Sequence, residues 1–247
     1  MSSRIIHGDC MEAIQLLPPC TMIFADPPDN LGLNYDIYVD KRPDYYQWLE
    51  LLILKSLPKC SIFWLSYYWE HDLEIKYAVR QILRHRHPAW GAKSFLWRYT
   101  FGQYRESDCA SGFRFILRLV SPTATLYPDA IRVESERMRL GDVRAAGPRV
   151  PDDVWDFPRV VGNSGERRSW HPTQHPESLM ERILLLSTKR GDSVVDLFNG
   201  TGTTMRVGLR LGRDVTGIEL SGDYAMKAAE ENRVPLISIS DLLEAKP

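Results

Sequence analysis

The C-terminal third of the chain alternates short apolar runs with amphipathic stretches, and this alternation limits the folds open to it. The runs at 193–197 and 215–218 have the length of buried strands, whereas 176–189, 203–211 and 223–232 carry apolar residues at helical spacing. Strands separated by helices usually pair in parallel, and helices then cover both faces of the sheet. We therefore expect an α/β fold with a doubly wound, mostly parallel sheet.

The N-terminal half extends this pattern. It contains predicted strands at 22–25 and 61–65 and predicted helices at 45–57 and 70–86. The runs 95–100 and 113–120 are expected to form an antiparallel pair, because the connection between them is too short for a crossover helix.

Residues 122–170 lack long periodic segments and are rich in Pro, Gly, Asp and Arg. We interpret them as an irregular insertion in a single domain spanning 1–247, and as a candidate target-recognition element.

Composition excludes several classes of protein. With 247 residues, of which 44% are hydrophobic and 26% charged, the chain has the composition of a globular protein rather than a disordered one. It has no apolar run near the roughly 18 residues of a membrane span, and its first residues do not form a signal peptide. The four cysteines are widely spaced, so we expect neither a metal site nor disulfides, and a reducing cytoplasm; they are Cys10, Cys20, Cys60 and Cys109.

A glycine-rich turn, Asp196-Leu-Phe-Asn-Gly-Thr-Gly-Thr-Thr204, follows the strand at 193–197. Gly200 and Gly202 permit positive φ and the close approach of a ligand. Glu219, at the end of the next strand, is suited to accept hydrogen bonds from ribose hydroxyls. The third glycine of a dinucleotide site and the lysine of a phosphate loop are both missing, which favours an adenosyl group without phosphates over an oxidoreductase cofactor. The alternative, an ordinary strand-to-helix turn, is disfavoured by the acidic strand ends.

A second turn, Asp26-Pro27-Pro28, follows the strand at 22–25. The prolines fix the backbone, and the carboxylate and a proline carbonyl offer two acceptors and no donor. That pair suits a neutral amino group, such as the exocyclic amine of a base. Asp-Pro-Pro alone is a common turn. However, ligands of open α/β sheets bind at the carboxyl ends of strands, so both turns are expected at one site.

With these two turns and a third motif, the sequence resembles the S-adenosylmethionine-dependent amino-methyltransferases of DNA, in their beta-order group. That family has a D/S/N-P-P-Y/F motif, a segment resembling H-P-T-Q-K-P, and a motif of F-x-G-x-G type. The corresponding segments here are Asp26-Pro-Pro-Asp29, His171-Pro-Thr-Gln-His-Pro176 and Phe198-Asn-Gly-Thr-Gly202. The resemblance implies a Rossmann-like methyltransferase fold with a permuted motif order.

The resemblance also implies the site residues. The S-adenosylmethionine site would comprise Asp9, Cys10, Asp26, His171, Thr173, Gln174, Asp196, Phe198, Asn199, Gly200, Gly202, Thr203, Thr204 and Glu219. The catalytic motif would be Asp26, Pro27, Pro28 and Asp29, holding an amine for direct in-line attack on the sulfonium methyl. A base in duplex DNA would first be flipped out of the stack.

One departure from the family pattern lies in the catalytic motif. The family has an aromatic residue where this chain has Asp29, and a carboxylate cannot stack on a base. Either a neighbouring ring such as Tyr35 or Tyr38 supplies the stacking face, with Asn30 and Asp29 contacting base edges, or the target is unusual or the activity weak. We favour the first explanation, because base stacking contributes roughly 1–3 kcal/mol.

The segment 76–118 is basic, with nine Lys or Arg against two Asp or Glu, and aromatic residues are mixed with the charges. This pattern is typical of contact with phosphates and bases, and Arg98 and Arg105 are candidate DNA contacts. The alternative is that the rings belong to the core of the strands and the arginines to a solvated edge.

The favoured function is site-specific methylation of the N6 amino group of adenine in DNA, because the Asp form of the motif leans to adenine in this family. The alternatives are methylation of cytosine N4, an RNA substrate, and a catalytically weak relative that keeps DNA or cofactor binding. The expected setting is DNA modification of the restriction-modification kind in the cytoplasm, with a bacterial, archaeal or phage-encoded protein. A homodimer is also considered, since relatives are often dimers, while no metal or membrane partner is expected.

Overall fold

A nine-stranded sheet in the order β6-β4-β5-β3-β2-β7-β8-β1-β9 runs through the computed structural model, which describes residues 3–103, 106–142, 144 and 147–244. The strands are β1 Arg4–His7, β2 Cys20–Ala25, β3 Cys60–Tyr67, β4 Gly91–Gln103, β5 Ser111–Val120, β6 Val154–Asp156, β7 Ser193–Asp196, β8 Asp214–Glu219 and β9 Leu236–Ser238. Within the described residues, β5 is the one strand that runs antiparallel to its neighbours. The expected mostly parallel sheet is confirmed.

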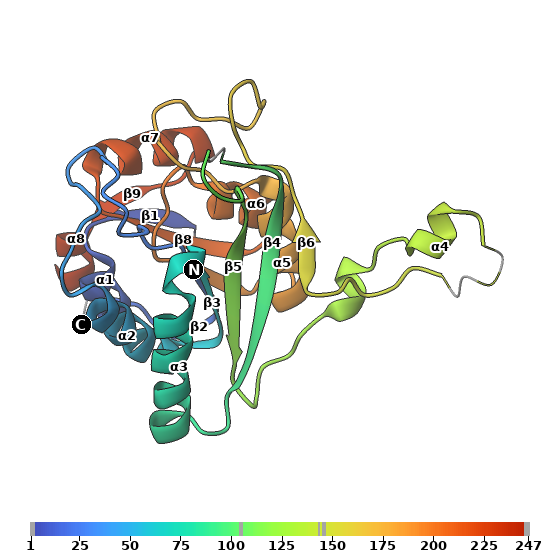
Figure 1. The fold of residues 1–247 in the computed structure, drawn as a ribbon. Coiled ribbons are helices and arrows are strands. Elements are labelled where there is room, and N and C mark those ends of the chain that lie inside the picture. The colour runs from blue at the N-terminus through green and yellow to red at the C-terminus, as the bar shows by residue number, and fades with distance from the viewer. Residues whose placement is uncertain (1–2, 104–105, 143, 145–146, 245–247) are drawn as a thin grey trace.

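Helices cover both faces of this sheet (Figure 1). Helices α1, α2, α3 and α8 pack on one face, and α5, α6 and α7 pack on the other. Their bounds are α1 Cys10–Leu16, α2 Tyr45–Ser56, α3 Asp72–Arg86, α5 Glu177–Ser187, α6 Thr203–Arg210, α7 Gly222–Asn232 and α8 Ile239–Glu244, and the single turn α4 is Glu136–Arg139. None of the helices in the described residues is long and apolar enough to cross a bilayer.

The predicted strands and helices all occur, with ends that differ by at most about four residues, and the antiparallel pair is β4 and β5. The predictions did not include β1, β9, α1 and α8. These elements are short, and they are stabilised by pairing and packing with distant segments rather than by a long periodic pattern.

Residues 122–170 hold more regular structure than their composition indicates. Trp155 of β6 is 1% exposed and packs on Phe95 and Trp64, so this part of the segment belongs to the core of the sheet. In contrast, the part around α4 projects from the body as an arm (Figure 1), closed at its base by pairing of Val133 with Arg149.

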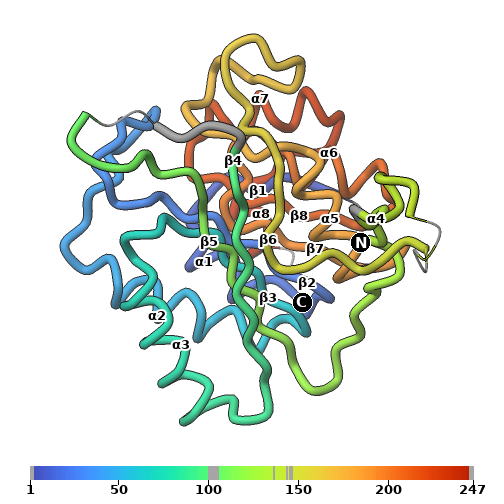
Figure 2. The backbone as a smooth tube through the Cα atoms, turned by 45° about the vertical axis from the view of Figure 1, so that its right-hand side comes forward, coloured from blue at the N-terminus to red at the C-terminus, as the bar shows by residue number. Residues whose placement is uncertain are grey.

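Segments from the two ends of the chain meet in the middle of the sheet (Figure 2). Strand β2 pairs in parallel with β7, and β1 pairs in parallel with β8. Between β2 and β7 the connections diverge, because β2 leads to β3 on one side and β7 leads to β8 on the other. Such a switch point leaves a crevice at the carboxyl ends of the strands.

Candidate functional site

A cavity of about 650 Å³ opens at the carboxyl ends of β1, β2, β7 and β8. Its size is that of a small-molecule site. The two turns singled out in the sequence both contribute to its wall. The sequence-predicted residues that line it are Asp9, Cys10, Asp26, Pro27, Pro28, Asp29, Asn30, Tyr35, His171, Thr173, Gln174, Asp196, Phe198, Asn199, Gly200, Thr203, Thr204 and Glu219.

The glycine turn is held to the end of β8 by the carboxylate of Glu219. Its two oxygens accept hydrogen bonds from the backbone N–H groups of Gly200 (2.8 Å) and Ser221 (3.0 Å). Gly200 has φ +47°, and a Cβ there would lie 3.2 Å from Nε2 of His171. The turn therefore needs glycine at this position, and the side chain of His171 closes over it. Burial raises the pKa of Glu219 above its ordinary value.

Asp196 lies at the floor of the cavity and is 3% exposed. One of its oxygens accepts from the N–H of Phe198 at 3.0 Å. Burial raises its pKa to about 7. After β1, Asp9 caps α1 by accepting from the N–H of Met11. Burial raises the pKa of the Cys10 thiol, which makes that thiol unreactive.

Asp26 lies in the same cavity and belongs to a polar cluster. One carboxylate oxygen accepts from Nη2 of Arg114 at 2.8 Å, and the other lies 3.3 Å from Nδ1 of His175. The hydroxyl of Ser66 lies 3.3 Å from Nε2 of His175 and accepts from Nε of Arg114 at 2.6 Å. Burial alone would raise the pKa of Asp26, but His175 and Arg114 outweigh burial and leave that pKa below its ordinary value.

Arg114 and His175 are not among the sequence-predicted site residues. His175 stands in the predicted motif, so its position offered a signal. Arg114 offered none, because it lies in an apolar strand pattern and could equally face solvent. It reaches the cavity because β5 runs antiparallel to β3, which places the start of β5 beside the carboxyl ends of the other strands.

The residues of the unusual motif position and its neighbours are also fixed. Both oxygens of Asp29 accept from Arg114, at 2.6 and 2.8 Å, and Oδ1 of Asn30 accepts from the N–H of Arg42 at 2.7 Å. The rings of Tyr35 and Tyr38 stack on one another with centroids 5.1 Å apart, and both line the cavity. Two aromatic rings thus lie in the wall of the cavity that also holds Asp26.

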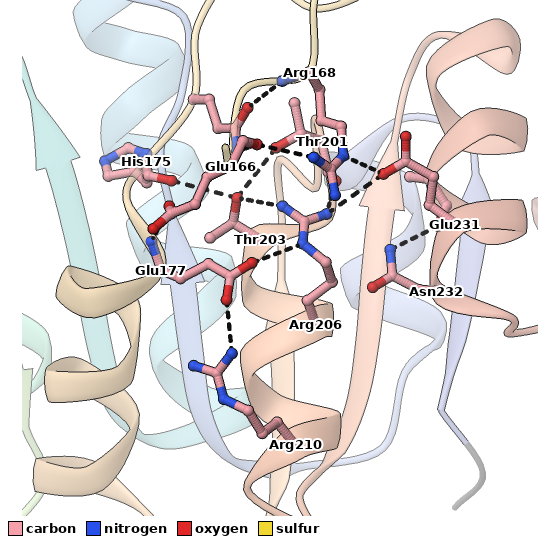
Figure 3. Close-up of polar contacts among 12 residues, drawn as sticks. Glu166, Arg168, His175, Glu177, Thr201, Thr203, Arg206, Arg210, Glu231 and Asn232 are labelled. Carbon is pink, nitrogen blue, oxygen red and sulfur yellow. Dashed lines mark hydrogen bonds and ion pairs between the residues drawn. The ribbon is translucent and has the colours of Figure 1, made fainter. Parts of the chain in front are cut away.

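A polar network anchors the third motif to the glycine turn (Figure 3). Arg206 of α6 donates to the carbonyl of Thr201, to the hydroxyl of Thr203 and to Glu177. The Gln174 amide closes the loop ahead of α5 by accepting from the N–H of Arg168 and donating to the carbonyl of Glu166. The hydroxyl of Thr203 donates to the carbonyl of His175 at 3.4 Å, and this bond joins the loop to the glycine turn.

Two sequence-predicted residues lie elsewhere. Gly202 does not line the cavity, because its φ of +73° turns it toward Asn232 and Ala228 of α7. Arg98 is also outside the cavity wall and pairs with Asp156 across the β4–β6 edge. Arg105 lies outside the described residues.

The aromatic residues of the basic segment divide between the core and the cavity. Phe95 is buried in the core, Trp97 is buried and also lines the cavity, and Tyr99 is half-buried at the cavity. No group of three His, Cys, Asp or Glu side chains able to hold a metal ion occurs in the part of the chain that the structure describes.

Known proteins resemble this chain along most of its length. Residues 20–231 match the family of N6/N4 methyltransferases, described as DNA methylase. The DNA adenine methyltransferase YhdJ of Escherichia coli is 33% identical over 242 residues, covering 90% of this chain and 80% of that protein. The type II methyltransferase M.HpaI of Haemophilus parainfluenzae is 30% identical, covering 93% of this chain and 74% of that protein.

Solved structures agree in fold. The cytosine-N4-specific PvuII DNA methyltransferase has a TM-score of 0.69 at 14% identity, with 96% of this chain and 95% of that chain covered. The M1.HpyAVI–SAM complex has a TM-score of 0.64 at 21% identity, with 92% and 97% covered. The sequence motifs, the family match and the identity to YhdJ lead to one conclusion: the chain belongs to the N6/N4 DNA methylase family of S-adenosylmethionine-dependent methyltransferases.

Proposed function

We propose that the protein methylates the N6 amino group of adenine at specific sites in DNA, using S-adenosylmethionine. The observation that carries this proposal is the placement of Asp26 and the Gly200–Glu219 turn on the wall of one cavity. The adenine target is supported by the 33% identity to YhdJ, which is named a DNA adenine methyltransferase. Cytosine N4 is the alternative target.

The wall fits the adenosyl group. At Gly200 the backbone itself lines the cavity, because an added side chain there would press against His171. The ring of Phe198 lines the same part of the wall. We assign Glu219 to the ribose hydroxyls, because each carboxylate oxygen that binds a backbone N–H retains a second acceptor site. We assign Thr173 and Gln174, with His171, to the methionine end. S-adenosylmethionine supplies an electrophilic methyl group at this site.

We assign to Asp26 and the carbonyl of Pro27 the task of holding the target amine. The ionised carboxylate accepts the N–H groups of the amine and so turns the nitrogen lone pair toward the methyl donor. No residue forms a covalent bond, so the contribution of the chain is positioning and electrostatic stabilisation. Tyr35 is our candidate for the ring that stacks on the flipped base in place of the missing motif aromatic.

The test is to incubate the purified protein with unmethylated genomic DNA and S-adenosylmethionine, and to identify methylated nucleosides by mass spectrometry. We expect N6-methyladenine. Finding N4-methylcytosine instead would refute the adenine target and keep the family activity. Methylation of RNA but not of DNA would refute the proposal and indicate an RNA enzyme. The absence of any methylated nucleoside, with cofactor binding intact, would refute it and indicate a catalytically weak binding protein.

Asp26→Ala tests the assignment of the amine-holding carboxylate. We expect methyl transfer to fall by at least about a hundredfold, because positioning groups contribute several kcal/mol to the barrier. Calorimetric binding of S-adenosylmethionine should stay within about threefold of the wild-type value, since Glu219 and the glycine turn are unchanged. Unchanged transfer would refute the role of Asp26.

A further inference from the structure

Two motif positions at which this chain departs from the family pattern lie against the same side chain. Asp29 stands where the family's D/S/N-P-P-Y/F motif has an aromatic residue, and His175 stands where its H-P-T-Q-K-P segment has lysine. Arg114 donates to both oxygens of Asp29, and it shares the hydroxyl of Ser66 with His175. The two departures are therefore connected in space through one guanidinium group.

Most N–H donors of this guanidinium are hydrogen-bonded to partners in the cavity wall. Nε donates to Ser66, Nη1 donates to Asp29, and Nη2 donates to Asp29 and to Asp26. Its side chain is 12% exposed, and the side chains of Asp26 and Asp29 are 22% and 16% exposed. Because the guanidinium is planar and its donors point in fixed directions, these hydrogen bonds restrict the orientation of both carboxylates.

The charges require this cation. Two carboxylates share a poorly hydrated wall, where like charges repel more strongly than in water. The imidazole of His175 adds positive charge beside them only at lower pH, because burial lowers its pKa. Arg114 is thus the permanent positive charge beside both acids. Asp26 still has acceptor sites free, since its two oxygens together have about four lone-pair sites.

We propose that Arg114 is the positioning residue of the amine-holding carboxylate of Asp26 and that Asp29 is its counter-ion. Arg114 thus lies between the two departing motif positions: it pairs with Asp29 and shares the Ser66 hydroxyl with His175. This inference rests on the proposed function for its catalytic consequence, but the ion cluster itself does not depend on which base is methylated. It also explains why an acid is tolerated beside Asp26: the second carboxylate balances the guanidinium rather than opposing the first.

The test is a double-mutant cycle with Arg114→Gln, Asp29→Asn and the double variant. In Arg114→Gln the two carboxylates lose their cation, so we expect kcat to fall by about a hundredfold or more while the KM for S-adenosylmethionine changes by less than about threefold. Removing Asp29 as well relieves the repulsion, so the double variant should recover at least about tenfold of the lost kcat. If the fold-losses in kcat of the two single variants simply multiply in the double variant, the proposal is overturned. A wild-type kcat in Arg114→Gln would overturn it as well.

Arg118→Gln is the matched control. Arg118 lies on the same strand, is half-buried and packs over Trp64 and Phe95, outside the cavity wall. We expect its kcat to stay within about twofold of the wild-type value, because it touches none of the assigned groups. If Arg118→Gln lost as much kcat as Arg114→Gln, the loss would be a general effect of removing an arginine side chain from β5. The positioning role would then be overturned.

A second readout works without activity. The ¹³C carboxyl signal of Asp26, assigned with Asp26→Asn, is followed as a function of pH. The ionisable groups that face this carboxylate are Asp29, Arg114, His171, His175 and Asp196, while nearby tyrosines stay neutral because burial raises their pKa. We expect Asp26 to titrate higher in Arg114→Gln than in the wild type, and lower again in the double variant.

The two readouts separate the two proposals. If the wild-type protein methylates no nucleic acid, the proposed function fails. The titration of Asp26 still tests whether Arg114 and Asp29 set the pKa of that carboxylate. If the wild-type protein methylates DNA but neither kcat nor the Asp26 titration responds to Arg114→Gln, this inference fails and the proposed function stands.

Discussion

Gly202 sets both the backbone of the glycine turn and its packing on α7. Its φ is +73°, and an added Cβ would lie 2.7 Å from Nδ2 of Asn232, which donates to the carbonyl of Ala228. We expect Gly202→Ala to lower the free energy of unfolding by about 2–3 kcal/mol, because strain and a collision add. Cofactor affinity should fall severalfold, since the turn shifts. Urea denaturation and calorimetry measure the two effects.

Gly141→Ala separates the two causes. Gly141 has nearly the same φ, +72°, but an added Cβ there meets no described heavy atom within 4 Å. Its cost should therefore be the backbone strain alone, about 1 kcal/mol, with cofactor binding unchanged. Equal costs at both glycines would show that the contact with Asn232 contributes nothing.

Asp196 makes stability depend on pH. Burial raises its pKa from 3.8 to about 7, so between these values the folded protein keeps a proton that the unfolded chain releases. Stability contributed by this group is therefore lost as pH rises through this window. Asparagine does not titrate, so Asp196→Asn lacks this loss. The difference in free energy of unfolding, variant minus wild type, should therefore increase by about 2 kcal/mol from pH 5 to pH 8. A difference that stays constant over this range, measured by urea denaturation, would contradict the assignment.

The sequence predicted those cavity residues that stand in motifs, but not their partners. Asp26, Gly200 and Glu219 could be placed because each follows an apolar strand, and carboxyl ends of parallel strands share an edge. Arg114 could not be placed, because its position depends on the direction of β5 relative to β3. A pattern of apolar residues gives the existence of a strand, whereas its direction is decided by tertiary packing.

At the scale of elements, Arg206 links helix α6 to the turn that precedes it. It donates to the carbonyl of Thr201 at 2.6 Å, to the hydroxyl of Thr203 at 3.2 Å and to Glu177 at 3.1 Å (Figure 3). We expect Arg206→Ala to weaken binding of S-adenosylmethionine about tenfold, because the loss of two tethers on the turn corresponds to about 1.4 kcal/mol. Calorimetry measures the change.

Arg210→Ala is the control on the same helix. Arg210 donates to Glu177 at 2.6 Å, and its ion pairs within the described residues are with Glu177 and Glu181 of α5 rather than with the turn. Its removal should leave cofactor affinity within about twofold. Similar losses in both variants would place the effect in the α5–α6 contact and not in the turn.

The elements that the sequence revealed are those with enough residues to show a period. Helix α3 and strand β3 are of this kind. Strand β6 has three residues, and its position comes from Trp155, whose ring is buried against Phe95 on another strand. Three residues cannot display an alternation, so such a strand is visible only once its partners are known.

For the whole molecule, we propose that the positive charge of the projecting arm contributes to DNA binding. Arg137 and Arg139 of the arm are exposed. We expect neutralising both to alanine to weaken DNA binding and to reduce the slope of log affinity against log salt by about 1–2, because each phosphate contact contributes about 0.9. Fluorescence anisotropy between about 50 and 200 mM salt measures this slope.

Lys189 and Arg190 provide a matched loss of two charges. They are exposed just before β7, at the amino ends of the strands and thus on the edge opposite the cavity. Their replacement by alanine should leave the salt slope unchanged. If both pairs reduce the slope equally, the protein attracts DNA through its overall field, and the arm has no special part in binding.

The pairing of β2 with β7 has a consequence for synthesis on the ribosome. The turn that holds Asp26 is made early, but its cavity closes only after the strand that ends at Glu219 has been translated. Until β7 has been translated, β2 has an unpaired side that is open to misassociation. The cavity wall is therefore complete only when the late strands have paired with the early ones.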